Sequence, residues 1–274
     1  MKNSKLNKKI MMLGLGILMT IPSFAITGTE VSQLARDRDT GKTVMAAMEM
    51  KLVSKSGKVE SDRRLMTWGY KYDIEKDLSK VVMEFKSPAS IAKTRFLQVE
   101  NEIGRDDDKW IYLPALGRVR RISSSDKTSS FVGSDFTYGD METREVFEDT
   151  HKLLKEEKYG EYDCYVVESV PVEKDDSQYA KRITWVAKES YIPLKAELYS
   201  KKTNEIQKRL TVQGKLEKVQ GIWSVFSTTM ENLETGHKTL LDVAKKDGKY
   251  LLRYNGKMNP KRFTQSFIKT GRAK

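Results

Sequence analysis

Apolar and polar residues alternate with a period of two along most of the chain, and this pattern limits the fold more than any other feature. In residues 44–52, for example, every even-numbered residue is apolar, whereas Glu49 and Lys51 fall on the other parity. Successive side chains of a strand point to opposite faces, so the pattern predicts strands with one apolar face. Similar segments recur as far as Tyr254 with mostly short turns between them, which predicts a mainly β, antiparallel fold.

The length of these predicted strands bears on the shape of the sheet. Several are longer than the typical length of about five or six residues. A long, flat, open sheet exposes edges that can pair with other chains, and curling reduces that exposure. We therefore expect one closed or strongly curved antiparallel sheet, with an ordinary sandwich core as the alternative. Short helices are expected over residues 28–39 and from Asn259 through Phe267.

The N-terminus has the pattern of a signal peptide. Four lysines in the first nine residues precede an apolar run from Ile10 to Ile21, and Ser23 and Ala25 fit a cleavage site after Ala25. The run is shorter than the ~20 apolar residues of a membrane span. We predict that residues 1–25 are a signal peptide and that residues 26–274 form a single exported domain.

The charge of the chain bears on its partners. Loss of the four lysines in residues 1–25 lowers the formal net charge from +12 to +8. A basic exported protein is attracted to anionic membrane surfaces or acidic partners, and export argues against nucleic acid. The lysines are scattered, so solubility explains the charge equally well. The single cysteine, Cys164, excludes an intramolecular disulfide, and we expect it to be a small buried residue.

Methionine and aromatic side chains are frequent on the apolar parity of the predicted strands. Such side chains line adaptable binding surfaces more often than they fill tight cores. We expect nine of them to line a ligand-binding cavity: Met48, Met50, Met66, Trp68, Tyr70, Met83, Phe85, Trp110 and Tyr112.

The segment from residue 106 to residue 141 differs in composition and pattern from the rest of the chain. It predicts a hairpin that turns at residues 114–117, followed by a serine-rich loop at residues 123–130. Long loops in a compact domain are usually functional or disordered, and the aromatic residues after this one argue against disorder. We expect a lid or gating loop that contains Phe131, Phe136 and Tyr138.

Three arginines follow the hairpin turn. Arg118 and Arg120 share one face of a predicted strand, and Arg121 lies on the opposite face. Arginine binds phosphate and other anionic groups well, so the three are candidates for contact with a headgroup or a partner. The alternative is a solvated strand that protects a sheet edge.

The run of residues 110–122, WIYLPALGRVRRI, together with residues 133–138, GSDFTY, resembles the outer-membrane lipoprotein-sorting protein family of the LolA/LolB-like superfamily. The chain is similar to a divergent branch that is longer than the short carriers. The resemblance implies a half-open antiparallel barrel around an apolar cavity, with short helices as a lid. It also implies a soluble periplasmic carrier. We therefore predict a carrier that binds the acyl chains of a lipoprotein or lipid for transfer toward the outer membrane, with an inner-membrane exporter and an outer-membrane acceptor as partners. We expect the protein to be a monomer.

Catalytic and metal-binding patterns are scarce. The two histidines, His151 and His237, lack ligand spacing, and there is no G-x-S-x-G motif. Asp135 and Asp140 are a conceivable acid–base pair, but capping of turns and of a following helix explains them better. We expect no enzyme activity, no metal and no cofactor. The alternatives to a carrier are a non-catalytic accessory protein of an inner-membrane exporter that binds protein and, less well supported, an outer-membrane barrel.

Overall fold

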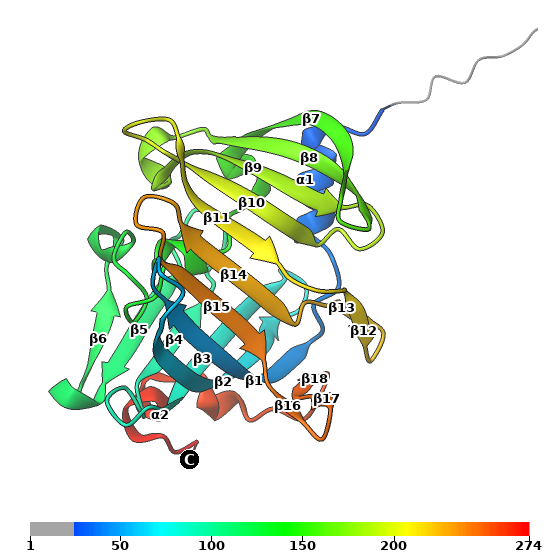
Figure 1. Cartoon of the computed structure of the whole chain (residues 1–274). Coiled ribbons are helices and arrows are strands. Elements are labelled where there is room, and N and C mark those ends of the chain that lie inside the picture. Colours follow the sequence, from blue (N-terminus) through cyan, green and yellow to red (C-terminus); the bar gives the residue numbers. More distant parts are fainter. Residues whose placement is uncertain (1–24, 274) are drawn as a thin grey trace, which may run out of the picture.

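The computed structural model describes residues 25–273, so the predicted signal peptide lies outside the described residues apart from Ala25. One antiparallel sheet contains fourteen strands and forms most of the molecule (Figure 1). The mainly β, antiparallel prediction is therefore confirmed. Along the sheet the strands are β6 (Arg118–Ile122), β5 (Asp108–Leu113), β4 (Arg95–Val99), β3 (Leu78–Ser87), β2 (Val59–Asp73), β1 (Thr43–Val53), β15 (Lys238–Val243), β14 (Ser227–Asn232), β11 (Ile206–Val212), β10 (Pro193–Ser200), β9 (Tyr179–Ala187), β8 (Tyr162–Pro171) and β7 (Asp149–Tyr159), with β18 (Leu252–Tyr254) paired to β1.

The sheet is neither closed nor strongly curled, because β6 and β7 remain separate edges in the described structure. The expectation of a closed or strongly curved sheet, and of the half-open barrel that the resemblance implied, is wrong in this respect. Charge protects the edges instead of curling. Three of the five residues of β6 are arginines, and β7 carries three lysines and two glutamates.

Strand register divides the side chains of the sheet between two faces. We call one the cavity face; it carries Met50 on β1, Phe85 on β3 and Leu198 on β10. We call the other the α2 face; it carries Trp68 and Val82, which are paired across β2 and β3. Strands β1–β6 form the first half of the sheet, and β7–β11 with β14 and β15 form the second half.

Helix α1 (Gly28–Arg36) covers the cavity face at the far end of the second half. Its first turn is closed by a capping box, in which Thr27 and Glu30 satisfy each other's backbone N–H groups. A Cβ on Gly28 would lie 2.6 Å from the backbone nitrogen of Leu153, so only glycine allows this approach to β7. Val31 is fully buried against Val167 and Val186. The short helix expected near residue 28 is confirmed.

Helix α2 (Gln265–Thr270) covers the α2 face of the first half. Phe267 and Ile268 pack against Trp68 and its neighbours on this face. The guanidinium of Arg95 donates to the carbonyl of Ile268 at 3.1 Å and thereby satisfies a carbonyl of the last turn. The helix expected from Asn259 through Phe267 is instead a 3-10 turn, Pro260–Arg262, followed by α2.

The α2 face of the second half is covered by a smaller element, the hairpin of β12 (Glu217–Val219) and β13 (Ile222–Ser224) with its flanks. Leu216 and Trp223 from this region pack against Cys164 and Trp185. Cys164 is buried, as expected. Another small hairpin joins β16 (Lys245–Lys246) to β17 (Lys249–Tyr250). None of the helices between residues 25 and 273 is long and apolar enough to cross a membrane.

Candidate functional site

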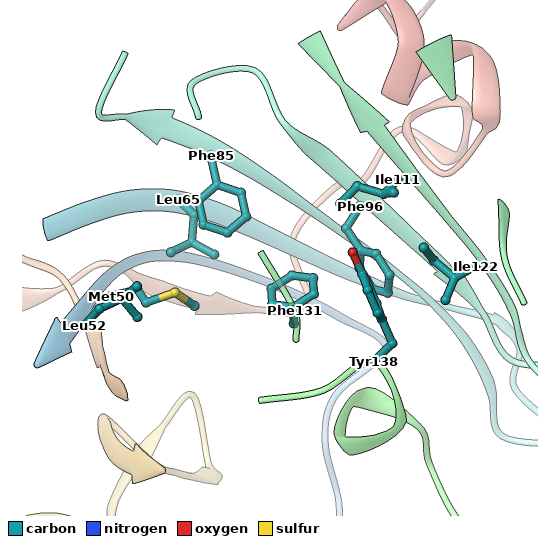
Figure 2. Close-up of a cluster of buried hydrophobic side chains, with 9 residues drawn as sticks. All are labelled: Met50, Leu52, Leu65, Phe85, Phe96, Ile111, Ile122, Phe131 and Tyr138. Carbon is teal, nitrogen blue, oxygen red and sulfur yellow. The ribbon is translucent and has the colours of Figure 1, made fainter. Parts of the chain in front are cut away.

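A long loop, residues 123–148, crosses the cavity face, and we call it the crossing loop. Phe131 and Tyr138 from this loop are 1% and 5% exposed and belong to the same cluster as Phe85 and Phe96 of the sheet (Figure 2). The rings of Phe131 and Phe96 meet edge to face, with centroids 5.2 Å apart. The first half of the cavity face is therefore filled by aromatic side chains. A gating role for the loop stays a prediction.

A cavity of about 440 Å³ lies on the cavity face of the second half. Ala196, Leu198, Leu210 and Met230 come from three adjacent strands and form its apolar floor, and Phe136 of the crossing loop lies beside them. Helix α1 contributes Ser32, Ala35 and Arg36 to the wall. The volume falls within the range of about 300–1,000 Å³ that is typical of small-molecule sites.

Ion pairs surround this apolar floor. Asp149 is only 2% exposed at its side chain and pairs with Arg144 at 2.9 Å and with Arg182. Arg36 on α1 pairs with Glu145 of the crossing loop at 3.1 Å. Burial lowers the pKa of the Arg182 guanidinium, and the carboxylate of Asp149 works in the opposite direction. Each of these charges needs an opposite partner, because burial of an unpaired charge would lower the stability of the folded protein.

Asp140 connects the crossing loop to the sheet below it. Its carboxylate accepts hydrogen bonds from the Tyr179 hydroxyl at 2.8 Å and the Gln178 amide at 2.9 Å, and Lys208 lies at 3.2 Å. Burial, followed by the charge of Asp140, raises the pKa of Tyr179. Asp140 also accepts from the backbone N–H of Thr137. It is thus a structural carboxylate that closes a turn, as expected, but it lies within a 3-10 turn, Gly139–Met141, and not before a helix.

Asp135, the other half of the conceivable acid–base pair, has separate partners. Its carboxylate lies 2.7 Å from Nδ1 of His237 and accepts from the hydroxyl of Thr239 at 2.7 Å. Lys208 joins the two residues, because its ammonium donates to the backbone carbonyl of Asp135 at 2.7 Å and to the carboxylate of Asp140 at 3.2 Å. No hydrogen bond of the described structure joins the two carboxylates directly. The absence of enzyme activity stays a prediction.

His151 is a cavity residue that the sequence did not reveal. Its Nε2 lies 2.8 Å from the carbonyl of Val146, which can only accept, so Nε2 carries the proton. Its Nδ1 faces two hydroxyls, that of Ser32 on α1 at 3.0 Å and that of Ser169 on β8 at 2.8 Å. The imidazole thereby links the helix, the crossing loop and the sheet at one point of the cavity wall.

A larger hollow of about 710 Å³ lies on the other side of Phe136, Gln178 and Tyr179, which line both spaces. Its wall consists mainly of hydroxyls, amides and charged groups, among them Lys201 and Lys202. It lacks an aliphatic floor in the described structure. The smaller cavity is therefore the better site for an apolar ligand.

The nine side chains expected to line one cavity lie on both faces of the sheet. Met48, Met50, Met83 and Phe85 lie on the cavity face of the first half, at or beside the Phe131 cluster. The other five pack on the α2 face near Phe267: Met66, Trp68, Tyr70, Trp110 and Tyr112. None of the nine lines the cavity of the second half. They do not share a common cavity, and lipid contact by any of them stays a prediction.

The three arginines lie on β6, at the end of the sheet farthest from β7. Arg120 pairs with Asp126 at 3.2 Å, and Arg121 pairs with Asp108. Arg118 is exposed beside the turn at Pro114–Leu116, where the predicted hairpin is confirmed. A headgroup contact by these residues stays a prediction. Among residues 25–273, no group of three or more histidine, cysteine or acidic side chains is arranged to hold a metal ion.

Solved structures of other proteins share this arrangement. A DUF1329 family protein from Desulfovibrio piger superimposes with a TM-score of 0.80 at 29% identity, over 88% of this chain and 97% of that one. An outer membrane lipoprotein-sorting protein domain from Vibrio parahaemolyticus gives a TM-score of 0.77 at 33% identity, over 88% of this chain and 98% of that one. The chain belongs to the outer-membrane lipoprotein-sorting protein family.

The remaining comparisons concern the fold and the range of a family match. A LolA superfamily protein from Nitrosomonas europaea shares the fold, with a TM-score of 0.64 at 18% identity over 89% of this chain and all of that one. A family model described only as an uncharacterized protein matches residues 77–270. No curated protein matches the chain. The resemblance drawn from residues 110–122 and 133–138 is thus confirmed.

Proposed function

We propose that this LolA-like chain carries the acyl part of a lipoprotein or lipid through the periplasm toward the outer membrane. The observation that carries the proposal is the apolar-floored cavity of about 440 Å³ in the second half of the sheet. Burial of one methylene contributes about 0.8 kcal/mol, so a sixteen-carbon chain supplies on the order of 10 kcal/mol before ordering costs. Binding alone can therefore hold such a chain, without covalent chemistry.

The name of the similar Vibrio parahaemolyticus domain supports the same function, because it refers to sorting of outer membrane lipoproteins. In this role the protein would receive cargo from an inner-membrane exporter and deliver it to an outer-membrane acceptor. Release requires a partner that competes for the acyl chain, since a cavity that binds tightly also retains its ligand. A soluble monomer that contacts membranes transiently fits these steps.

One surface feature favours contact with partner proteins. Ile103, Phe147 and Val172 are 73%, 59% and 54% exposed, and all three line a groove of about 360 Å³ beside the cavity. The groove and the cavity share the wall that contains Glu142 and Glu145. A protein bound in the groove would touch the segment that encloses the cargo. The competing function, an accessory protein of an exporter that binds only protein, would use the groove and leave the cavity empty.

Native mass spectrometry distinguishes the two functions. The mature protein is exported to the periplasm, purified without detergent and weighed, and any adduct is extracted for lipid analysis. We expect a stoichiometric lipid adduct that is lost in Ala196→Phe, which fills the cavity floor. Val59→Phe, at a half-exposed position on β2, is the size-matched control and should retain the adduct. A clean apo mass with no uptake of lipid from vesicles would favour the accessory protein.

A further inference from the structure

We infer that residues 245–274, which we call the C-terminal segment, form a docking surface for membranes that contain anionic phospholipids. This surface would supply the membrane contact of the proposed periplasmic carrier, so the inference rests on that function and deepens it. Three features of the segment lead to it: its net charge, the lack of carboxylate partners for that charge, and the shape of the surface that presents it.

The net positive charge of the mature chain is concentrated in the C-terminal segment. Lysines occur throughout the chain, but residues 245–274 contain ten lysines and arginines and a single acidic residue, Asp247. The formal net charge of the segment is therefore +9, whereas residues 26–244 have 36 basic and 37 acidic residues and a net charge of −1. Solubility requires only a net charge, but an excess on one part of the molecule also orients that part toward an anionic surface.

These basic side chains lack carboxylate partners in the described structure. Nine of the ten lie among the described residues, and none of the nine belongs to a described ion pair. Eight are exposed, and the half-buried Arg262 lies over the ring of Trp68 at 4.2 Å. A phosphate can therefore approach them without displacing a carboxylate. The nine are Lys245, Lys246, Lys249, Arg253, Lys257, Lys261, Arg262, Lys269 and Arg272.

The fold holds the C-terminal segment along one end of the molecule, at the bottom of Figure 1. The β16–β17 hairpin leads into β18, which pairs with β1. Phe263, Phe267 and Ile268 then belong to the apolar cluster of the α2 face. The amide of Asn259 donates to the carbonyl of Ala273 at 3.3 Å and ties the two ends of this last part together. The charges are thus carried by a folded surface.

The shape of this surface suits a bilayer better than a single anionic ligand. The C-terminal segment lines none of the three hollows described above, so none of them offers an enclosed phosphate site within it. Six of the nine described basic residues are lysines, which act as point charges on flexible stems. Leu251 is 41% exposed among them. Membrane-surface binding combines attraction to anionic headgroups with burial of apolar side chains, and the segment offers both.

Docking through the C-terminal segment leaves the candidate cargo site free. Neither the cavity nor the groove beside it contains a residue of the segment. Helix α2 lies on the face of the sheet opposite the cavity. A carrier held at a membrane in this way can still exchange cargo with a membrane-bound partner protein.

The test is flotation of the mature wild-type protein with two kinds of vesicle, one of phosphatidylethanolamine with phosphatidylglycerol and the other of phosphatidylcholine alone. We expect binding to the anionic vesicles only, and loss of most of it between ~50 mM and ~200 mM NaCl, because salt screens exposed charges. Binding to neither kind of vesicle at the lower salt concentration would overturn the inference and leave an acidic protein as the partner of the segment. Equal binding to both kinds would overturn it as well, since charge would then not select the membrane.

Two triple variants of equal net charge separate this surface from the charge of the whole protein. One lysine near an anionic membrane strengthens binding about fivefold, so loss of three should weaken it on the order of 100-fold. The charges of the control variant lie elsewhere on the surface and are screened by salt, so we expect a change of less than about twofold. Equal weakening in both variants would overturn the inference. The test variant combines Lys246→Gln, Lys257→Gln and Lys261→Gln, and the control combines Lys58→Gln, Lys152→Gln and Lys202→Gln, all at exposed positions.

The lipid adduct seen by native mass spectrometry distinguishes failure of this inference from failure of the carrier function. The test variant leaves the cavity unchanged, so its adduct should match that of the wild-type protein. A retained adduct together with vesicle binding that ignores the three lysines would contradict the docking surface alone. A wild-type protein without an adduct that still binds anionic vesicles through these lysines would contradict the carrier function alone.

Circular dichroism of both triple variants checks that they are folded, and we expect spectra identical to that of the wild-type protein because the substituted side chains are exposed.

Discussion

The two halves of the sheet are built alike on the α2 face and differently on the cavity face. On the α2 face each half has an apolar cover, α2 over the first and the β12–β13 hairpin over the second. On the cavity face the first half is filled by Phe131 and Tyr138, whereas the second half encloses a hollow framed by ion pairs. The difference is therefore confined to the cavity face.

Aromatic and charged side chains account for the difference between the two halves. Aromatic side chains collapse onto a neighbouring apolar strand, because contact between them is favourable. Charged side chains such as Arg182 and Asp149 cannot collapse onto Leu198 without losing their partners. Buried ion pairs contribute little net stability, but they fix positions. In this molecule they hold the crossing loop and α1 away from the cavity floor.

The largest effect is expected in the filled half. Phe131→Ala should lower the free energy of unfolding by about 3–5 kcal/mol, because a fully buried ring is removed from a packed cluster. Urea unfolding followed by tryptophan fluorescence measures the change. Phe147→Ala, an exposed phenylalanine of the same loop, is the control and should cost no more than about 0.5 kcal/mol. A small loss for Phe131→Ala would mean that the loop does not fill the first half in solution.

Loss of charge among the ion pairs around the cavity should lower the free energy of unfolding. Asp149→Asn leaves Arg144 and Arg182 without their buried carboxylate, and we expect a loss of about 3 kcal/mol in unfolding free energy. Glu156→Gln on the same strand breaks an exposed pair with Lys188 and should cost less than about 1 kcal/mol. Equal effects of the two substitutions would show that the buried ion pairs of Asp149 contribute no more to stability than the exposed pair of Glu156.

The sequence predicts the strands well and their faces poorly. The period-two pattern locates β1 and β2, and it correctly groups Met48 with Met50 and Trp68 with Tyr70. It could not tell that the first pair points to the cavity face and the second to α2, because both faces of the first half are covered and apolar. A parity argument assigns a side chain to the core only where the opposite face is solvated.

The cavity could not be predicted from the sequence, for a different reason. Its floor residues are ordinary core types, and its charged frame is assembled from α1, the crossing loop and three strands that are far apart in sequence. One local signal was present. Arg182 and Lys208 share their parity with the apolar neighbours Val186 and Leu210, and a charge on an apolar face marks a polar partner or a hollow. That signal points to the second half, where the cavity lies.

The carboxylate of Asp107, near the first half of the sheet, differs from the paired carboxylates around the cavity. Asp107, just before β5, accepts from Gln98 at 3.0 Å and Asn101 at 3.3 Å, and none of the described ion pairs includes it. Burial raises the pKa of Asp107 to about 6, with Lys109 acting in the opposite direction. The unfolded chain has a pKa of about 3.9 for aspartate, so the folded state binds this proton more tightly.

The stability of the folded protein should depend on pH through Asp107. Protonation of Asp107 favours the folded state, so its contribution falls as the pH rises from about 4 to about 6 and stays low above that range. Asp107→Asn should therefore stabilise the protein at pH 7 by about 1–2 kcal/mol, after allowance for partial solvent contact, and flatten the pH profile between these values. Thermal unfolding at a series of pH values measures both. Asp106→Asn, at the exposed neighbouring position, is the control, and an identical profile for the two variants would contradict the assignment to Asp107.

The smallest stability effect is expected in the cavity floor. Leu210 already faces a hollow, so Leu210→Ala should cost only about 1 kcal/mol, below the ~2–5 kcal/mol of a fully packed leucine. The substitution removes three carbons from the floor, and at roughly 25 Å³ per carbon the preferred acyl chain should lengthen by two or three carbons. Competition among acylated peptides of increasing chain length, followed by native mass spectrometry, measures the shift. Leu116→Ala, in the exposed turn before β6, should leave the preference unchanged. If Leu210→Ala were as costly as Phe131→Ala and left the chain-length preference unmoved, the two halves would be equally packed in solution.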